Sequence, residues 1–191
     1  NGTGPGDYNT SDSDAASHQI VGGVHLGASI DSESNGQPSA NANGDDLSNS
    51  DDEDGVTFVD QLVVGASACT DVQAHVGGFL NAFIDWNGDG DFDDANEQIA
   101  SDLPVSAGTN SVCFTVPAGA VSSTYARFRF TSDDPNGALG ATGSWPNGEV
   151  EDYPVSVASP DIEIQKTVYS GHDAGVSCTG SELVVAAPGS A

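Results

Sequence analysis

The stretch Tyr125-Ala-Arg-Phe-Arg-Phe-Thr131 decides the fold class. Its period of two places Phe128 and Phe130 on one face of an extended strand, where they belong in a hydrophobic core. The other face carries Arg127 and Arg129. Such a face meets either solvent or partner carboxylates, and we expect carboxylate partners because acidic side chains are abundant in this chain.

Short segments of the same kind recur along the chain, separated by turns rich in Gly and acidic residues. No segment shows a 3.6-residue hydrophobic period longer than two turns. This pattern predicts an all-β protein, an antiparallel β-sandwich of jelly-roll-like type with calcium-binding loops. The predicted strands are residues 56–59, 61–64, 69–76, 79–86, 112–116, 124–131 and 152–157.

The charge balance is strongly acidic, with 29 Asp and Glu against three Lys and Arg among 191 residues, for a formal net charge of -26. Such a surface repels phosphates and anionic lipids, so we expect no nucleic-acid partner. No apolar run approaches the roughly 20 residues of a membrane span, so we expect no membrane insertion. Many acids gather in three short stretches, where like charges oppose folding unless cations bind. The sequence therefore predicts bound metal ions.

The clearest metal motif is Asp85-Trp-Asn-Gly-Asp-Gly-Asp-Phe-Asp-Asp-Ala-Asn-Glu97. Oxygen donors at alternate positions, with Gly at the sixth, are typical of a Ca²⁺ loop. The acid expected at the twelfth position arrives one residue late, as Glu97, and the preceding segment alternates as a strand. We therefore expect a calcium loop on a β-scaffold, with a merely solvated acidic turn as the alternative. The candidate ligands are Asp85, Asn87, Asp89, Asp91, Asp93, Asp94 and Glu97.

Two further acidic clusters are candidate cation sites. The upstream cluster predicts a second calcium site, with a disordered acidic loop as the alternative. Its candidate ligands are Asp45, Asp46, Asp51, Asp52, Glu53 and Asp54. In the third cluster, Glu149 and Glu151 point the same way if the segment is a strand. They could hold calcium or bond the two arginines, and the alternative is an exposed acidic strand start.

Cysteine use favours a secreted or cell-surface protein. Cys69 and Cys113 lie in two predicted strands, and we expect a disulfide that ties non-adjacent strands and stabilises the fold by about 2 to 4 kcal/mol. Reduced, buried thiols in a cytosolic protein are the alternative. Cys178 is the odd one out, with its partner expected beyond the end of this chain or on another chain.

Residues 147–153 read Asn-Gly-Glu-Val-Glu-Asp-Tyr, the signature of the GEVED domain family. The Asp-Trp-Asn-Gly-Asp-Gly-Asp-Phe-Asp-Asp and Arg-Phe-Arg-Phe elements precede it in the order that the family has, so the chain resembles this family over roughly residues 18–158. The resemblance implies a module of large secreted and cell-surface proteins of bacteria and archaea, similar to calcium-stabilised adhesin modules. The segment 160–173 resembles the first strand of an immunoglobulin-like bacterial surface repeat.

Three parts are therefore expected along the chain. Residues 1–17 form a flexible leader, 18–158 a GEVED-like calcium-binding β-sandwich, and 159–191 a linker with an incomplete strand-forming extension. No catalytic motif stands out, since the four histidines are scattered without the spacing of a zinc hydrolase. We expect no enzyme.

The leading functional hypothesis is a non-catalytic, calcium-stabilised extracellular module that serves adhesion or acts as a structural spacer of a surface protein. Its partners would be other domains of the same surface protein or identical copies in a polymer. One alternative is a self-assembling extracellular filament subunit joined by C-terminal strand donation. Another is a calcium-dependent carbohydrate-binding module in which an exposed Trp145 contacts glycans.

Overall fold

Ten strands form the regular structure of the described residues, which are 15–30, 32, 39, 42 and 53–160 of the computed structural model. These residues contain no helix, and hence none that could cross a membrane. In chain order the strands are β1 (Ser17–His18), β2 (Val56–Phe58), β3 (Leu62–Val63), β4 (Ser67–Ala74), β5 (Gly78–Ile84), β6 (Gln98–Val105), β7 (Gly108–Thr115), β8 (Ser123–Thr131), β9 (Ser144–Trp145) and β10 (Glu149–Ala158).

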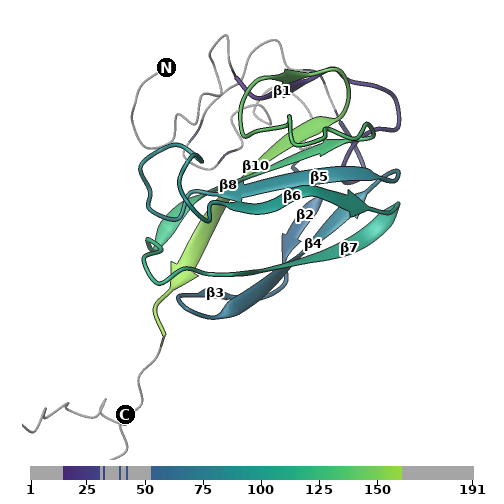
Figure 1. Ribbon diagram of the computed structural model, residues 1–191. Helices are drawn as coiled ribbons and strands as arrows, with labels where there is room; N and C mark the ends of the chain where they lie inside the picture. The colour runs from purple at the N-terminus through teal and green to yellow at the C-terminus, as the bar shows by residue number, and fades with distance from the viewer. Residues whose placement is uncertain (1–14, 31, 33–38, 40–41, 43–52, 161–191) are drawn as a thin grey trace, which may run out of the picture. The chain divides into compact units, whose positions relative to one another are not determined.

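The strands form two facing sheets and one small ribbon (Figure 1). The larger sheet has the order β3-β10-β8-β5-β6, the smaller one β2-β4-β7, and the ribbon pairs β1 with β9. The all-β sandwich predicted from the sequence is confirmed. Pairing is antiparallel except for β1–β9 and β3–β10, which are short parallel pairs between segments far apart in the sequence.

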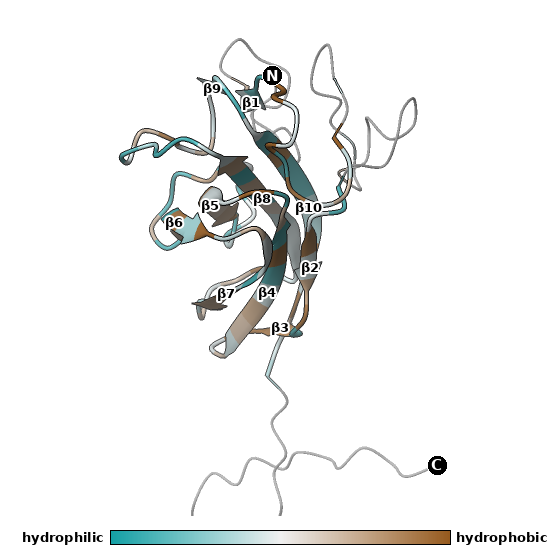
Figure 2. Ribbon diagram, turned by 90° about the vertical axis from the view of Figure 1, so that its right-hand side faces the viewer, coloured by the Kyte–Doolittle hydropathy of each residue, from teal (hydrophilic) through white to brown (hydrophobic). Residues whose placement is uncertain are grey.

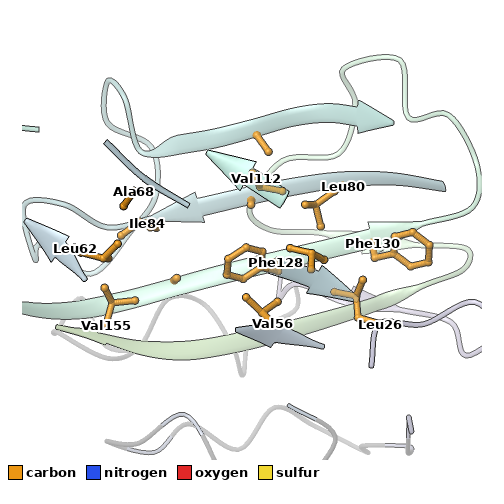
Figure 3. Close-up of a cluster of buried hydrophobic side chains, with 14 of the residues drawn as sticks. Leu26, Val56, Leu62, Ala68, Leu80, Ile84, Val112, Phe128, Phe130 and Val155 are labelled. Carbon is orange, nitrogen blue, oxygen red and sulfur yellow. The ribbon is translucent and has the colours of Figure 1, made fainter. Parts of the chain in front are cut away.

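The core lies between the inner faces of the two sheets. Side chains alternate along β8 as the sequence predicts, and Figure 2 shows the resulting hydrophobic and hydrophilic bands. Phe128 and Phe130 point inward and are fully buried, as is Leu80 of β5, and Val112 of β7 is buried with them (Figure 3). Each large apolar side chain buried in this way contributes about 1.5 to 3 kcal/mol.

Three strands lack a sequence signal. In β6, Pro104 has no N–H to donate to a neighbouring strand, so the sequence of this segment does not indicate a strand. In the structure Asp102 also has a positive φ of 43°, which is unusual within a strand. The structure accommodates both residues because β6 is an edge strand with register shifts opposite β5. The two-residue strands β1 and β9 are too short for any periodicity, and only long-range pairing defines them.

The disulfide between Cys69 and Cys113 is confirmed, with an S–S distance of 2.02 Å. It ties β4 to β7, two strands that are not consecutive in the chain, as expected. Cys69 of β4 and Cys113 of β7 face each other directly in neighbouring strands of the smaller sheet. The two strands are far apart in sequence but adjacent in space, which a single sequence does not reveal.

The chain divides into two units, 1–160 and 161–191, and the described residues belong to the first. Several predicted features lie outside the described residues. These are most of the leader (1–14), almost all of the C-terminal extension with Cys178 (161–191), and the candidate ligands Asp45, Asp46, Asp51 and Asp52.

Candidate functional site

The acidic loop connects β5 to β6 and is anchored at both ends. Asp85 follows the last residue of β5 and donates its backbone N–H to the Tyr125 carbonyl at 3.1 Å. At the other end, the Glu97 carbonyl accepts the N–H of Ile84 at 2.8 Å. Side chains at both anchors are buried, with Asp85 0% and Glu97 1% exposed. The loop therefore starts and finishes on a buried carboxylate.

The Asp85 carboxylate organises the first turn of the loop. Its two oxygens accept the backbone N–H groups of Gly88 at 2.6 Å and Gly90 at 3.1 Å. Both glycines have positive φ, 74° and 99°, a conformation that side chains other than glycine rarely adopt. The Gly spacing in the motif therefore has a local structural cause: it lets the chain wrap around one carboxylate.

Asn87 gathers two more carboxylates. Its side-chain amide donates to Asp89 at 2.9 Å and to Asp94 at 2.6 Å. Its amide oxygen accepts the N–H of Asp89 at 3.0 Å. The structure thus brings five of the seven predicted ligands around one turn, namely Asp85, Asn87, Asp89, Asp94 and Glu97.

Glu97 closes this group from the far end of the loop. Its oxygens accept the N–H of Trp86 at 2.9 Å and of Asp94 at 3.2 Å. Burial raises the pKa of Glu97 to about 7, and the charge of Asp85 acts in the same direction. A buried glutamate whose ionisation is disfavoured therefore sits at the base of the loop, beside the buried Asp85.

Asp91 and Asp93 are not drawn into the group. Both are exposed, and the Asp91 carboxylate accepts the Asp93 N–H at 3.0 Å. Between them, Phe92 is buried against Phe83, with ring centroids 6.0 Å apart, and lies 5.3 Å from the Arg127 guanidinium carbon. Phe92 fastens the loop to the sheet, and its neighbours point to solvent.

Among the described residues, no three or more His, Cys, Asp and Glu side chains form a ready metal cage. A Ca²⁺ loop of this type also uses amide and backbone carbonyl oxygens, which that set excludes. A depression of about 310 Å³ opens beside the loop. It is lined by Trp86, Asn87, Asp94, Ala95, Glu97, Pro117 and Gly119.

The outer face of β8 holds both arginines, as predicted, and both are fully buried. Arg127 binds Asp152 of the neighbouring β10 in a two-pronged contact, with Nε–Oδ1 at 2.8 Å and an N–O distance of 2.6 Å for the second prong. The expected carboxylate partner is therefore found for Arg127. It stands directly opposite in the strand register.

Arg129 has a different role. It donates to the backbone carbonyls of Gly140, Thr142 and Gly143 at 2.8, 2.6 and 2.7 Å, and so holds the loop between β8 and β9 over the sheet. Burial, followed by the charge of Arg127, lowers the pKa of Arg129 to about 10. With a pKa of about 10, Arg129 stays charged at neutral pH. Its guanidinium takes the place of the water that the three carbonyls would otherwise bind.

His18 of β1 connects this arginine to the following turn. Its Nε2 accepts from Arg129 at 3.1 Å and its Nδ1 donates to the Asn147 carbonyl at 2.6 Å. Burial and the charge of Arg129 lower the pKa of His18 to about 3. A neutral imidazole can accept from one neighbour while donating to the other, as these contacts require.

Glu149 and Glu151 lie on the face of the sheet opposite to the arginines, and they are buried, unlike an exposed strand start. In the register of β10 with β8 they stand opposite Phe130 and Phe128, so they face the core side of the sheet. The arginines face the other side. Glu149 is 5% and Glu151 1% exposed. The alternation along β10 was predicted, but the sequence does not reveal which face each set of side chains joins.

The two glutamates bind backbone groups of distant segments. Glu149 accepts the N–H of Leu26 at 2.6 Å, and Glu151 accepts that of Gly55 at 3.0 Å. Tyr153 donates its hydroxyl to Glu151 at 3.0 Å and accepts the N–H of Val56 at 3.1 Å. These contacts fasten Leu26, Gly55 and the start of β2 to the first half of β10.

The second and third acidic clusters meet at this place. Burial, then the charge of Glu151 and more weakly that of Glu53, raise the pKa of Tyr153 far above its usual value. Asp54, which is exposed, accepts the N–H of Ala28 at 2.9 Å. Acidic residues about a hundred positions apart, Glu53 and Asp54 on one side and Glu151 on the other, therefore lie around the point where the chain before β2 crosses β10.

Asn147 and Gly148 of the 147–153 motif shape the site, although the sequence pattern alone does not single them out. The side-chain oxygen of Asn147 accepts from Thr131 at 2.7 Å and from the Ser132 N–H at 3.0 Å, which holds the turn before β10. Gly148 has φ 105°, and a Cβ there would lie 1.8 Å from the Phe130 carbonyl oxygen. The Pro-Asn-Gly sequence signals a turn, but not this close approach.

The GEVED domain model matches residues 79–156, which run from β5 to β10 and contain all three motifs. These motifs meet at Arg127, where Phe92 comes from the acidic loop and Asp152 from the 147–153 segment. No match to the chain was found among curated proteins or among solved structures.

Proposed function

We propose that this chain is a non-catalytic, calcium-stabilised extracellular module that serves adhesion or acts as a structural spacer of a surface protein. One observation carries the proposal. Two fully buried carboxylates, Asp85 and Glu97, form the two ends of an acidic loop in which Asn87 gathers two further carboxylates. Burying like charges side by side opposes folding, and a bound cation reverses the sign of that contribution.

The donor set suits Ca²⁺. All five gathered side chains offer oxygen, and Ca²⁺ accepts six to eight oxygen ligands in flexible geometry, including backbone carbonyls and water. Asp85, Asn87, Asp89, Asp94 and Glu97 would hold the ion. The ion would supply charge neutralisation only, and it would favour the ionised form of Glu97.

A second ion belongs to the proposal at the crossing where Glu53, Asp54 and Glu151 meet. Glu151 is buried there, and Glu53 and Asp54 come next to it from the chain before β2. The neighbouring candidates Asp45, Asp46, Asp51 and Asp52 lie outside the described residues. A cation in this place would stabilise the attachment of the chain before β2.

An extracellular, non-catalytic role has three further supports. The carboxylates of Glu149 and Glu151 accept backbone N–H groups from distant segments, which suits a structural module. The Cys69–Cys113 disulfide is of the kind that persists in oxidising compartments. The GEVED match covers the motifs that build the sandwich.

The carbohydrate-binding alternative finds less support. Trp86 is 3% exposed and donates its indole N–H to the Asn96 carbonyl, and half-buried Trp145 donates its own to Thr131. Trp86 is thus too buried for a sugar to stack on its ring. The filament alternative depends on residues 161–191, outside the described residues.

Thermal unfolding tests the proposal. We expect millimolar Ca²⁺ to raise the melting temperature relative to EDTA, because a ligand that binds only the folded state at ten times its Kd adds about 1.4 kcal/mol. That is a shift of a few degrees for a domain of this size. MgCl₂ at equal ionic strength controls for screening of the net charge.

A variant assigns the effect to the loop. Asp85→Asn with Glu97→Gln keeps the shape of both side chains and removes both buried charges. We expect it to lose the larger part of the Ca²⁺-dependent shift, whereas Asp134→Asn, in an exposed turn, keeps all of it. Identical melts of the unaltered protein in calcium and in EDTA would sink the proposal.

A further inference from the structure

The Cys69–Cys113 disulfide lies on the outer side of the smaller sheet. Its neighbours in the two strands, Ala68 and Val112, are buried in the core, whereas Cys113 is exposed and Cys69 half-buried. β7 is an edge strand of that sheet, so nothing in the sheet lies beyond Cys113. Exposed disulfides, unlike buried ones, are those that exchange readily with thiols.

The bridge duplicates a connection that the backbone already makes. β4 and β7 pair over eight consecutive positions, from Ser67 opposite Thr115 to Ala74 opposite Gly108. The inward side chains of both strands are part of the core cluster. Cleaving the S–S bond therefore leaves the ladder and the core contacts of the two strands in place.

The two cysteines differ in the charge beside them, because the Asp60 carboxylate accepts the backbone N–H of Cys69 at 2.9 Å. Residues 103–132 contain no Asp or Glu, although the whole chain has 29 of them. Cys113 lies within this stretch, and the Ser111 hydroxyl stands 4.0 Å from its sulfur. Along its own strand Cys113 therefore has no acidic neighbour, and the nearest acids belong to the Cys69 side, where Asp71 of β4 stands opposite Ser111.

We propose that Cys69–Cys113 is a thiol-exchange site of the folded protein, at which a low-molecular-weight thiol attacks Cys113. The attacking sulfur must approach along the S–S axis. Cys113 is exposed on the edge strand β7, whereas half-buried Cys69 lies on β4, between β2 and β7. Access therefore selects Cys113.

The exchange balances in two steps. The thiolate sulfur bonds to Cys113 Sγ, the bond between the two cysteine sulfurs breaks, and its electron pair leaves on Cys69 Sγ, which takes up a proton. The small thiol is oxidised and Cys69 is reduced. A second thiol molecule then attacks the mixed disulfide, which releases Cys113 as a thiol and the small molecule as its symmetric disulfide.

The experiment uses the full chain with Cys178→Ser, which removes the remaining thiol. The protein is incubated with 2-mercaptoethanol in native buffer, quenched with N-ethylmaleimide at intervals and mapped by mass spectrometry. The rate is measured without urea and at urea concentrations below the unfolding transition. We expect a rate linear in thiol and changed less than about twofold by urea, since little surface is exposed in native-state exchange. The first adduct should be on Cys113, and the reduced product should keep a cooperative melt.

Two results would overturn the proposal. If exchange requires global unfolding, its rate rises about fivefold or more for each molar of urea. An adduct found first on Cys69 would contradict the direction of attack. The double variant Cys69→Ser with Cys113→Ser provides an independent check. It should fold, with a lower melting temperature, and failure to fold would refute the claim that the strand ladder suffices.

Discussion

Arg127 connects three segments that look independent in the sequence. It binds Asp152 of β10, the Ala141 carbonyl of the loop between β8 and β9, and the ring of Phe92 in the acidic loop. The sequence predicts that this arginine pairs with a carboxylate, but it does not predict which one. Alternation along β8 places both arginines on one face, yet only the register of β10 shows that Asp152, not Glu149 or Glu151, shares it.

The first residue-level prediction concerns this pair. Asp152→Asn keeps the side-chain shape but leaves the fully buried guanidinium without its counter-charge. Breaking a buried pair in this way costs about 3 kcal/mol, reduced where the partner has some contact with water. Asp152 is 24% exposed at its side chain, so we expect a loss of about 2 to 3 kcal/mol in urea unfolding.

The exposed Asp134 provides the control for that prediction. Its carboxylate accepts the N–H of Asn136, a bond that Asp134→Asn preserves. We expect this change to stay within about 0.5 kcal/mol of the unaltered protein. Equal effects of the two substitutions would show that the Arg127 pair contributes nothing particular to stability.

At the scale of elements, the N-terminal strap, residues 15–30, is part of the sandwich although its sequence carries no strong strand signal. β1 pairs with β9, Leu26 bridges to Ala74 of β4, and Glu149 holds the Leu26 N–H. Ser17, at the end of the expected leader, pairs with Ser144. A two-residue strand depends on its partners, which no local pattern of apolar residues specifies.

The strap gives a second prediction. Leu26 is fully buried in the core cluster, so Leu26→Ala should cost about 2 to 5 kcal/mol from lost burial and the cavity left behind. Ile20→Ala, in the same segment but 45% exposed, should cost less than about 0.5 kcal/mol. Denaturant unfolding compares the two. A Leu26 variant as stable as the Ile20 variant would mean that the strap does not contribute to the core.

The acidic loop shows which part of a motif can be understood from spacing alone. The positions of Asp85, Gly88 and Gly90 follow from a turn that closes on one carboxylate, and the sequence pattern indicates this. Phe92 was not singled out, because a single aromatic residue among acids has no period. Its contact with Arg127 requires strands that are distant in sequence.

At the scale of the whole molecule, the net charge of -26 is distributed unevenly. Part of it lies in the loop at Asp85–Glu97, and part at the crossing of Glu53 and Asp54 with β10. The sandwich itself was predictable from period-two segments and Gly-rich turns. Which acids share a site was not, because it depends on how the two sheets and the strap are assembled.

Terbium luminescence tests the central claim most directly, since Tb³⁺ replaces Ca²⁺ at oxygen sites and emits when a nearby tryptophan is excited. Trp86 lies inside the loop, next to Asp85; its backbone N–H donates to Glu97 and its indole N–H to the Asn96 carbonyl. We predict sensitised emission that Ca²⁺ suppresses, that Trp86→Phe abolishes and that Trp145→Phe leaves intact. Absence of sensitised emission, or emission that Ca²⁺ does not suppress or that survives Trp86→Phe, would contradict calcium binding by this loop.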